Sequence, residues 1–141
     1  MDYTAIGDTV NLASRLDGAN KFFHTRVLLA RSTYDHAGAG DWLARSLGNV
    51  QVVGKQEAVE LWNLLGRRAS APAELVRACD AFAAGLEHFH AARFAQAGEL
   101  FRTTLELLPD DGPSQTYADL CKQYQAAPPP EGWQVVRLSE K

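Results

Sequence analysis

The pattern of apolar residues changes at the segment Gly66–Pro72, GRRASAP, which has the composition of a linker. Before it, short apolar runs alternate with turn residues, whereas beyond it apolar positions recur with a helical period almost without interruption. A change of period of this kind predicts two structural parts. We expect a mixed part over residues 1–66, a linker over 67–72, a helical extension over 73–127, and a proline-rich turn with a C-terminal tail over 128–141.

The first part is predicted to belong to the α+β class. Tyr3–Ile6 is expected to be the end of a short strand, Gly7 permits a sharp turn, and Asp8 is a good N-cap for a helix that begins at Thr9. Two late strands with a short glycine-containing turn between them indicate an antiparallel hairpin rather than a doubly wound parallel sheet. The later segments are expected to be strands at 26–30, 43–53 and 58–65, with a helical turn at 32–37.

The extension is predicted to contain three helices, over 73–91, 94–108 and 114–126. Its first two helices resemble one tetratricopeptide repeat, in which small residues let the helices approach closely. A solenoid of such repeats needs about three of them, so the third helix must supply the missing cover. The tail over 133–138 either docks back on this hairpin or remains mobile. The resemblance rests on Gly85, Leu86, Phe89, Phe94, Ala97, Phe101 and Pro109.

The aromatic stripe of the extension has two interpretations, a packed core or a binding groove, and the helical spacing favours the core. It consists of Phe82, Phe89, Phe94 and Phe101.

Composition excludes several classes of function. Lys and Arg total 14 against 17 Asp and Glu, so nothing indicates a nucleic-acid or anionic-membrane surface. No apolar run approaches the roughly 18 residues of a membrane span, which is typical of a soluble cytoplasmic chain. Cys79 and Cys121 lie in amphipathic segments without a signal peptide, so we expect buried thiols of a reducing compartment rather than a disulfide.

Few residues carry a chemical signal. Asn11 and Arg15 lie one helical turn apart, and they form either a solvated helix face or a pair that acts on a phosphorylated ligand. Spacing alone leaves both open. His88 and His90 are two residues apart on a predicted helix and so point to different faces, which disfavours a metal site. The segment 110–113, DDGP, is interpreted as a structural turn.

Two runs carry a resemblance to a known family. The first, YTAIGDTVNLASRLDGANK, resembles the signature of class III nucleotidyl cyclases, and the downstream LGNVQVVGKQEAVELWNLL resembles the closing strands of that catalytic domain. The resemblance covers residues 2 to about 66. It implies the C-terminal portion of a ferredoxin-like cyclase domain with a mixed or antiparallel sheet, in which the ribose 3′ oxygen is joined to the α-phosphate and pyrophosphate is expelled.

The resemblance assigns roles to four residues. Asn11 would orient the ribose, and Arg15 would stabilise the charge that builds on the α-phosphate. Thr4 occupies the position that reads the purine edge and favours ATP over GTP, while Lys55 resembles a lysine near the triphosphate. Many members have a second lysine where this chain has Val53, which is a departure from the family pattern.

The resemblance also implies what this sequence does not contain. The family binds two Mg²⁺ or Mn²⁺ ions through aspartates that precede the signature, and Asp2 and Asp8 are interpreted as turn residues rather than replacements. We therefore expect this chain to supply half of an active site that it shares with a second cyclase domain, and to be inactive alone. We also expect Met1 to lie within a longer protein, and the resemblance of the tail to those of bacterial cyclases implies that the N-terminal part of this protein is a membrane-anchored sensor.

The rival hypothesis is a non-catalytic interaction module, in which the helical hairpin binds a protein partner and the cyclase remnant is scaffold.

Overall fold

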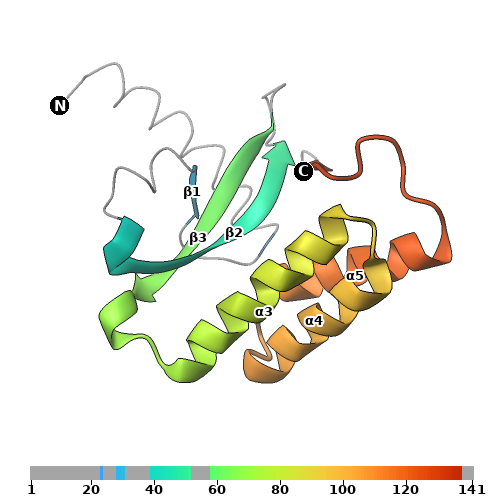
Figure 1. The fold of residues 1–141 in the computed structure, drawn as a ribbon. Helices are drawn as coiled ribbons and strands as arrows, with labels where there is room; N and C mark the ends of the chain where they lie inside the picture. Colours follow the sequence, from blue (N-terminus) through green and yellow to red (C-terminus); the bar gives the residue numbers. More distant parts are fainter. Residues whose placement is uncertain (1–22, 24–27, 31–38, 52–57, 138–141) are drawn as a thin grey trace, which may run out of the picture.

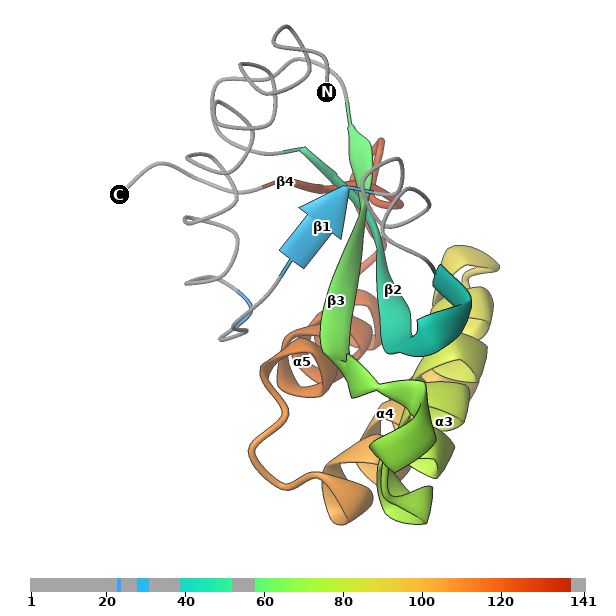
Figure 2. The same ribbon diagram turned by 90° about the vertical axis from the view of Figure 1, so that its left-hand side faces the viewer.

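The computed structural model describes residues 23, 28–30, 39–51 and 58–137, and every structural statement below concerns these residues. Figures 1 and 2 show helices α3, α4 and α5 gathered on one side of the β2–β3 strand pair, so a helical layer covers one face of a sheet. The four strands lie in the order β1-β3-β2-β4. The α+β class is thus confirmed. The strands are β1 (Leu28–Ala30), β2 (Trp42–Gln51), β3 (Val59–Arg67) and β4 (Val136–Arg137), with a short 3-10 turn η1 (Ala39–Asp41) before β2.

Strands β2 and β3 form the predicted antiparallel hairpin, with Val50 opposite Val59 and Ser46 opposite Trp62. β1 pairs antiparallel with the other edge of β3 and confirms residues 28–30 of the strand predicted at 26–30. The register of β2 shifts between Ser46 and Asn49, and such a bulge bends a strand and re-aims its side chains. The predicted end of this strand at 52–53 and the predicted helical turn at 32–37 lie outside the described residues.

The helical layer agrees closely with the predicted helices. It consists of α3 (Ala73–His90), α4 (Phe94–Leu107) and α5 (Gly112–Ala126). α3 and α4 approach closely at Gly85, where an added Cβ would lie 2.8 Å from a ring carbon of Phe101. α5 begins two residues earlier than predicted because Asp111 is its N-cap and Pro113 occupies its first turn, where proline is tolerated.

The aromatic stripe belongs to the core, as predicted. Phe82, Phe89 and Phe101 are fully buried, and each has its ring next to that of Tyr117 of α5. The same buried cluster includes side chains of the sheet, so both layers share one core. The expected linker 67–72 begins with the last residue of β3 and continues into the 3-10 turn η2 (Arg68–Ser70). The sheet residues of the cluster are Leu28, Leu47, Val50, Leu61 and Val136.

The C-terminal tail docks back on the fold, which decides between the two expected outcomes for the described residues 133–137. Trp133 packs against the aromatic core, and Val136 is buried. β4 extends the sheet by pairing parallel with β2, with Val136 opposite Val50. This strand was not predicted. None of the described helices is long and apolar enough to cross a membrane.

Candidate functional site

The predicted site residues lie outside the part of the chain that the structure describes. Their roles therefore stay predictions. The structure describes the strands that flank Lys55 in the sequence, because β2 ends at Gln51 and β3 begins at Val59. It also describes the contacts that fix these strands to the helical layer. The predicted site residues are Thr4, Asn11, Arg15 and Lys55, and the positions compared with the family pattern, Asp2, Asp8 and Val53, also lie outside the described residues.

A buried arginine joins the sheet to the helices. Arg45 of β2 has a side chain that is only 2% exposed, and its two terminal nitrogens lie 2.8 and 2.5 Å from the carboxylate oxygens of Asp111. Its Nε and Nη2 also donate to Asn63 Oδ1 at 3.1 and 3.0 Å. The guanidinium carbon lies 4.6 Å from the ring centroid of Phe82. A fork-shaped pair of this kind is the strongest side-chain hydrogen bonding that a protein offers.

Asp111 connects this cation to the start of α5. Its Oδ2 accepts hydrogen bonds from the backbone N–H of Ser114 at 3.3 Å and from the Ser114 hydroxyl at 2.5 Å, as an N-cap does. The DDGP segment therefore has a structural role, as predicted. Its ion pair with Arg45 was not predicted. Since the carboxylate already has several partners within the fold, this cluster positions elements rather than performing catalysis.

Sequence reasoning missed Arg45, although the sequence contains a signal for it. Leu43, Arg45 and Leu47 alternate along β2, and all three are buried. A charged residue on the apolar face of an alternating strand needs a partner of opposite charge. The partner could not be named in advance, because Asp111 lies 66 residues further along the chain.

A second polar contact holds α5 to the bulge of β2. The buried hydroxyl of Tyr117 donates to the backbone carbonyl of Leu47, and burial raises the pKa of this phenol. Gly48 follows with a φ of 85°, a conformation that favours glycine. An added Cβ at Gly48 would lie 2.9 Å from the Tyr117 oxygen and 3.5 Å from a ring carbon of His90. Backbone and side chains therefore approach here more closely than any larger residue would allow.

The two histidines have separate surroundings, as their spacing predicts. His88 Nδ1 accepts a 2.8 Å hydrogen bond from Arg93 Nε. His90 Nε2 is buried, and no described residue hydrogen-bonds to it. Burial lowers the pKa of His90, and a hydrogen bond with the backbone of Gln134 acts in the opposite direction. Within the described ranges, no group of three or more His, Cys, Asp or Glu residues could hold a metal ion.

Both cysteines are buried free thiols. Burial raises the pKa of Cys79, and it raises that of Cys121 to about 11. The thiolate is the nucleophilic form of cysteine, so both thiols are weak nucleophiles near neutral pH. They contribute to packing rather than to chemistry.

Comparison with known proteins gives two similarities, both to adenylate cyclases. The chain is 29% identical over 126 residues to "Adenylate cyclase, terminal-differentiation specific" of Dictyostelium discoideum, a match that covers 87% of this chain and 6% of that protein. It is 39% identical over 67 residues to "Adenylate cyclase 1" of Rhizobium meliloti (strain 1021), covering 47% of this chain and 10% of the relative. No family model matches, and no solved structure matches.

The length of the longer match shows which parts of the chain it includes. A continuous match over 87% of the chain includes the β2–β3 hairpin and helices α3 and α4, wherever it begins. The chain spans only 6% and 10% of the lengths of these two relatives. The similarities therefore support a relation to adenylate cyclases that extends beyond the sheet into the helical layer.

Proposed function

We propose that this chain is part of a class III adenylate cyclase, which converts ATP to cyclic AMP and pyrophosphate. The observation that carries the proposal is the similarity to an adenylate cyclase over 87% of the chain. The signature-like run over residues 3–21 supports the class, because its glycine, aspartate, asparagine and arginine match the family pattern in register. In this proposal the chain supplies the half of a shared site that stabilises the transition state, and a second cyclase domain completes it.

The roles of the site residues follow from their chemistry. Arg15 stabilises negative charge on the α-phosphate, because a guanidinium offers a fork of donors that matches phosphate oxygens. Comparable arginines in phosphoryl transfer contribute roughly 10³- to 10⁵-fold in rate. Asn11 orients the ribose, and Thr4 hydrogen-bonds the adenine edge through its hydroxyl. Lys55 contacts the triphosphate from the connection between β2 and β3.

Two features of the fold support the assignment to a ferredoxin-like cyclase domain followed by a tetratricopeptide-like hairpin. The run that resembles the closing strands of a cyclase domain, residues 47–65, includes the end of β2 and most of β3, which pair there with Asn49 opposite Glu60 and Val50 opposite Val59, as expected of a ferredoxin-like cyclase domain. The close approach of α3 and α4 at Gly85 is the packing expected of a tetratricopeptide-like hairpin. The third helix then covers the hairpin, and α3 and α5 contact β2 of the sheet.

The family's two Mg²⁺ or Mn²⁺ ions would neutralise the triphosphate and activate the attacking hydroxyl. Among the described residues, no group of three or more His, Cys, Asp or Glu side chains could hold these ions. The metal ligands belong, in this proposal, to a part of the parent protein that precedes the signature. The parent would then present its cyclase domain in the cytoplasm, where ATP is available.

Complementation tests the proposal. The chain alone, with ATP and Mg²⁺ or Mn²⁺, is expected to form no detectable cyclic AMP. When it is mixed with a longer cyclase chain whose equivalent of Arg15 has been replaced, activity should return, and Arg15→Ala in this chain should abolish the rescue. Arg102→Ala, at an exposed position of α4, is the matched control and should rescue normally. Robust formation of cyclic AMP by the chain alone would contradict the proposal that it supplies only half of an active site.

The same measurement addresses the rival hypothesis of a non-catalytic interaction module. An interaction module would give no rescue with any variant, including the unmodified chain. Phe82, Phe89 and Phe101 are fully buried in the core, so their rings do not form a binding groove while the fold is closed.

A further inference from the structure

The C-terminal segment 128–137, which we call the strap, crosses from the helical layer back to the sheet. Three prolines, Pro128–Pro130, follow α5 and prevent the helix from continuing. Two short turns come next, closed by hydrogen bonds from Trp133 N to the Pro130 carbonyl at 3.2 Å and from Val135 N to the Gly132 carbonyl at 3.1 Å. The strap then ends in β4 at the edge of β2. The strap therefore turns twice against the helical layer before it pairs with the sheet.

An aromatic socket holds the first half of the strap. The Trp133 ring lies 5.1 Å from that of Phe94, 5.3 Å from that of Phe89 and 6.2 Å from that of Tyr124, in edge-to-face arrangements with each. These three rings, which we call the socket, belong to α3, α4 and α5. The second half of the strap is held by Val136, which is only 7% exposed and pairs with Val50. The two anchors are thus a tryptophan and a valine three residues later.

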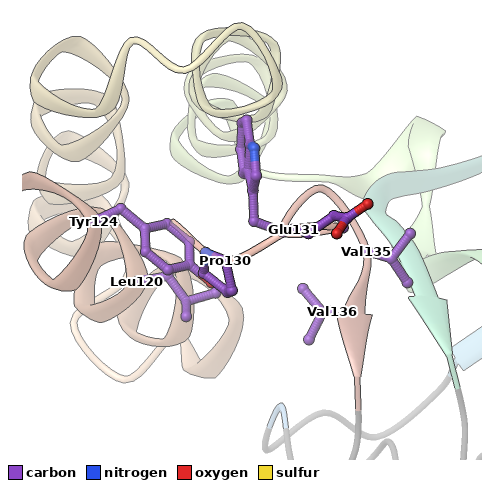
Figure 3. Close-up of a pocket in the computed structure, with 8 residues that line it drawn as sticks. Leu120, Tyr124, Pro130, Glu131, Val135 and Val136 are labelled. Carbon is purple, nitrogen blue, oxygen red and sulfur yellow. The ribbon is translucent and has the colours of Figure 1, made fainter. Parts of the chain in front are cut away.

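The attachment of the strap is thin compared with that of its neighbours. β4 is two residues long and pairs with a single neighbouring strand, whereas β2 has ten residues and is paired on both sides. Trp133 and Val135 are only half-buried. A cavity of about 260 Å³ remains where the strap meets α5. Figure 3 shows Leu120 and Tyr124 on one side of it and Val136 on the other.

We propose that the strap opens independently of the rest of the fold, and that the site it leaves accepts a peptide segment that follows the same path. The site consists of the β2 edge at Val50–Gln51 and the aromatic socket. Its partner is a peptide segment that turns as the strap does and has a tryptophan followed three residues later by a valine or isoleucine. The strap itself is the template for this chemistry. The proposal is independent of the cyclase activity proposed above.

The physical argument has two parts. When β4 leaves, the backbone groups of β2 at this edge lose their partners, and an unpaired edge accepts another strand readily. At the same time the socket loses the indole ring that fills it, and buried aromatic anchors dominate the energy of such contacts. A segment that supplies both the backbone pairing and the ring restores both contacts, whereas a segment that supplies one of them does not.

Hydrogen exchange of the unmodified full chain tests the independent opening. The backbone amides of Trp133 and residues 135–137 should exchange at least about tenfold faster than those at the centre of α3, because opening the strap leaves the helices folded. Equal rates in the two regions would mean that the strap opens only with global unfolding, and would overturn this part of the proposal.

Peptide binding tests the docking site. A fluorescent peptide with the sequence of residues 128–141 should bind the full chain carrying Trp133→Ala, in which the socket has lost its own ring. The unmodified chain should bind it at least about tenfold more weakly, because its tethered strap competes at an effective concentration near the millimolar range. The same peptide with Trp133→Ala is the matched control and should not bind.

Circular dichroism shows whether the variant chain keeps its helices, and a second variant, Val136→Asp, opens the other anchor if Trp133→Ala does not fold. Absence of peptide binding to a variant that remains helical would overturn the docking site. Equal binding by both peptides would also overturn it, because the tryptophan would then play no part.

Discussion

The helical layer is fixed to β2 at two places, and the two attachments differ in kind. Towards the start of β2, Arg45 forms a buried, forked ion pair with the N-cap of α5, and Tyr117 adds a hydrogen bond to the Leu47 carbonyl. Towards its end, the strap is held by an aromatic ring and a two-residue strand. In the first attachment Arg45, Asp111 and Tyr117 all have hydrogen-bond partners, so we expect substitutions of these side chains to lower stability strongly. The second attachment buries less side-chain surface, and we expect the strap to open while the first attachment stays in place.

The largest expected effect is at the charged attachment. Asp111→Ala leaves the Arg45 guanidinium buried without its counter-charge and removes the N-cap of α5. We expect the free energy of unfolding to fall by roughly 3 to 5 kcal/mol, as for other broken buried pairs. Urea denaturation measures this loss. Asp110→Ala, at the exposed neighbouring residue, is the control and should change stability by less than about 0.5 kcal/mol. If both variants lowered the free energy of unfolding equally, the buried ion pair would not be what makes this attachment strong.

Trp133→Ala is expected to have an intermediate effect at the other attachment. Truncating a fully buried aromatic residue costs about 3 to 5 kcal/mol, and Trp133 is half-buried, so we expect roughly half of that. The loss should be local, with faster amide exchange in residues 133–137 and little change in the pairing of β2 with β3. If amides throughout β2 and β3 exchanged faster by the same factor, the two attachments would not be separable.

Tyr117→Phe should have a smaller effect than either. It removes one hydrogen bond to the Leu47 carbonyl while keeping the ring that packs against Phe82, Phe89 and Phe101. A single hydrogen bond contributes about 1 kcal/mol, and the carbonyl left behind is buried. Thermal denaturation should show this decrease. An unchanged or raised melting temperature would mean that the hydroxyl contributes nothing to the attachment.

The smallest effect should come from His90, which lies beside Gly48 and hydrogen-bonds with the backbone of Gln134 in the strap. Burial lowers its pKa below the ordinary value of 6.5, so the unfolded chain takes up the proton first as the pH falls. The contribution of His90 to stability is therefore complete above about pH 6.5 and decreases as the pH falls below it.

Stability measured at pH 7.5 and 5.5 tests this dependence. The unmodified chain should be less stable at pH 5.5, and His90→Gln should reduce the difference. A larger difference in the His90→Gln chain would contradict the assigned direction of the pKa shift.

Whether the sequence could predict a feature depended on how far apart its residues lie in the chain. Apolar periodicity located α3, α4 and α5 within two residues, because each helix buries one stripe, with Phe89 on α3, Phe101 on α4 and Tyr117 on α5. The short turn between two β-rich runs predicted the β2–β3 hairpin for a similar local reason. Both signals depend on residues that are close in the sequence.

The missed features depend on residues that are far apart. The ion pair between Arg45 and Asp111 spans 66 positions, and β4 is a strand only because the strap reaches the edge of β2. A run of two residues has no period that a sequence could reveal. The candidate site was predicted from a family resemblance alone, and Asn11, Arg15, Thr4 and Lys55 lie outside the described residues, so those assignments stay predictions.

The most direct test of the central claim is the rescue of cyclic AMP formation in a longer cyclase chain that lacks its own transition-state arginine. We expect this chain to restore turnover and its Arg15→Ala variant to lose at least about 10³-fold of the restored rate, which is the lower end of what such an arginine contributes. Equal rescue by the unmodified chain and the alanine variant would contradict the proposal that Arg15 completes a cyclase site.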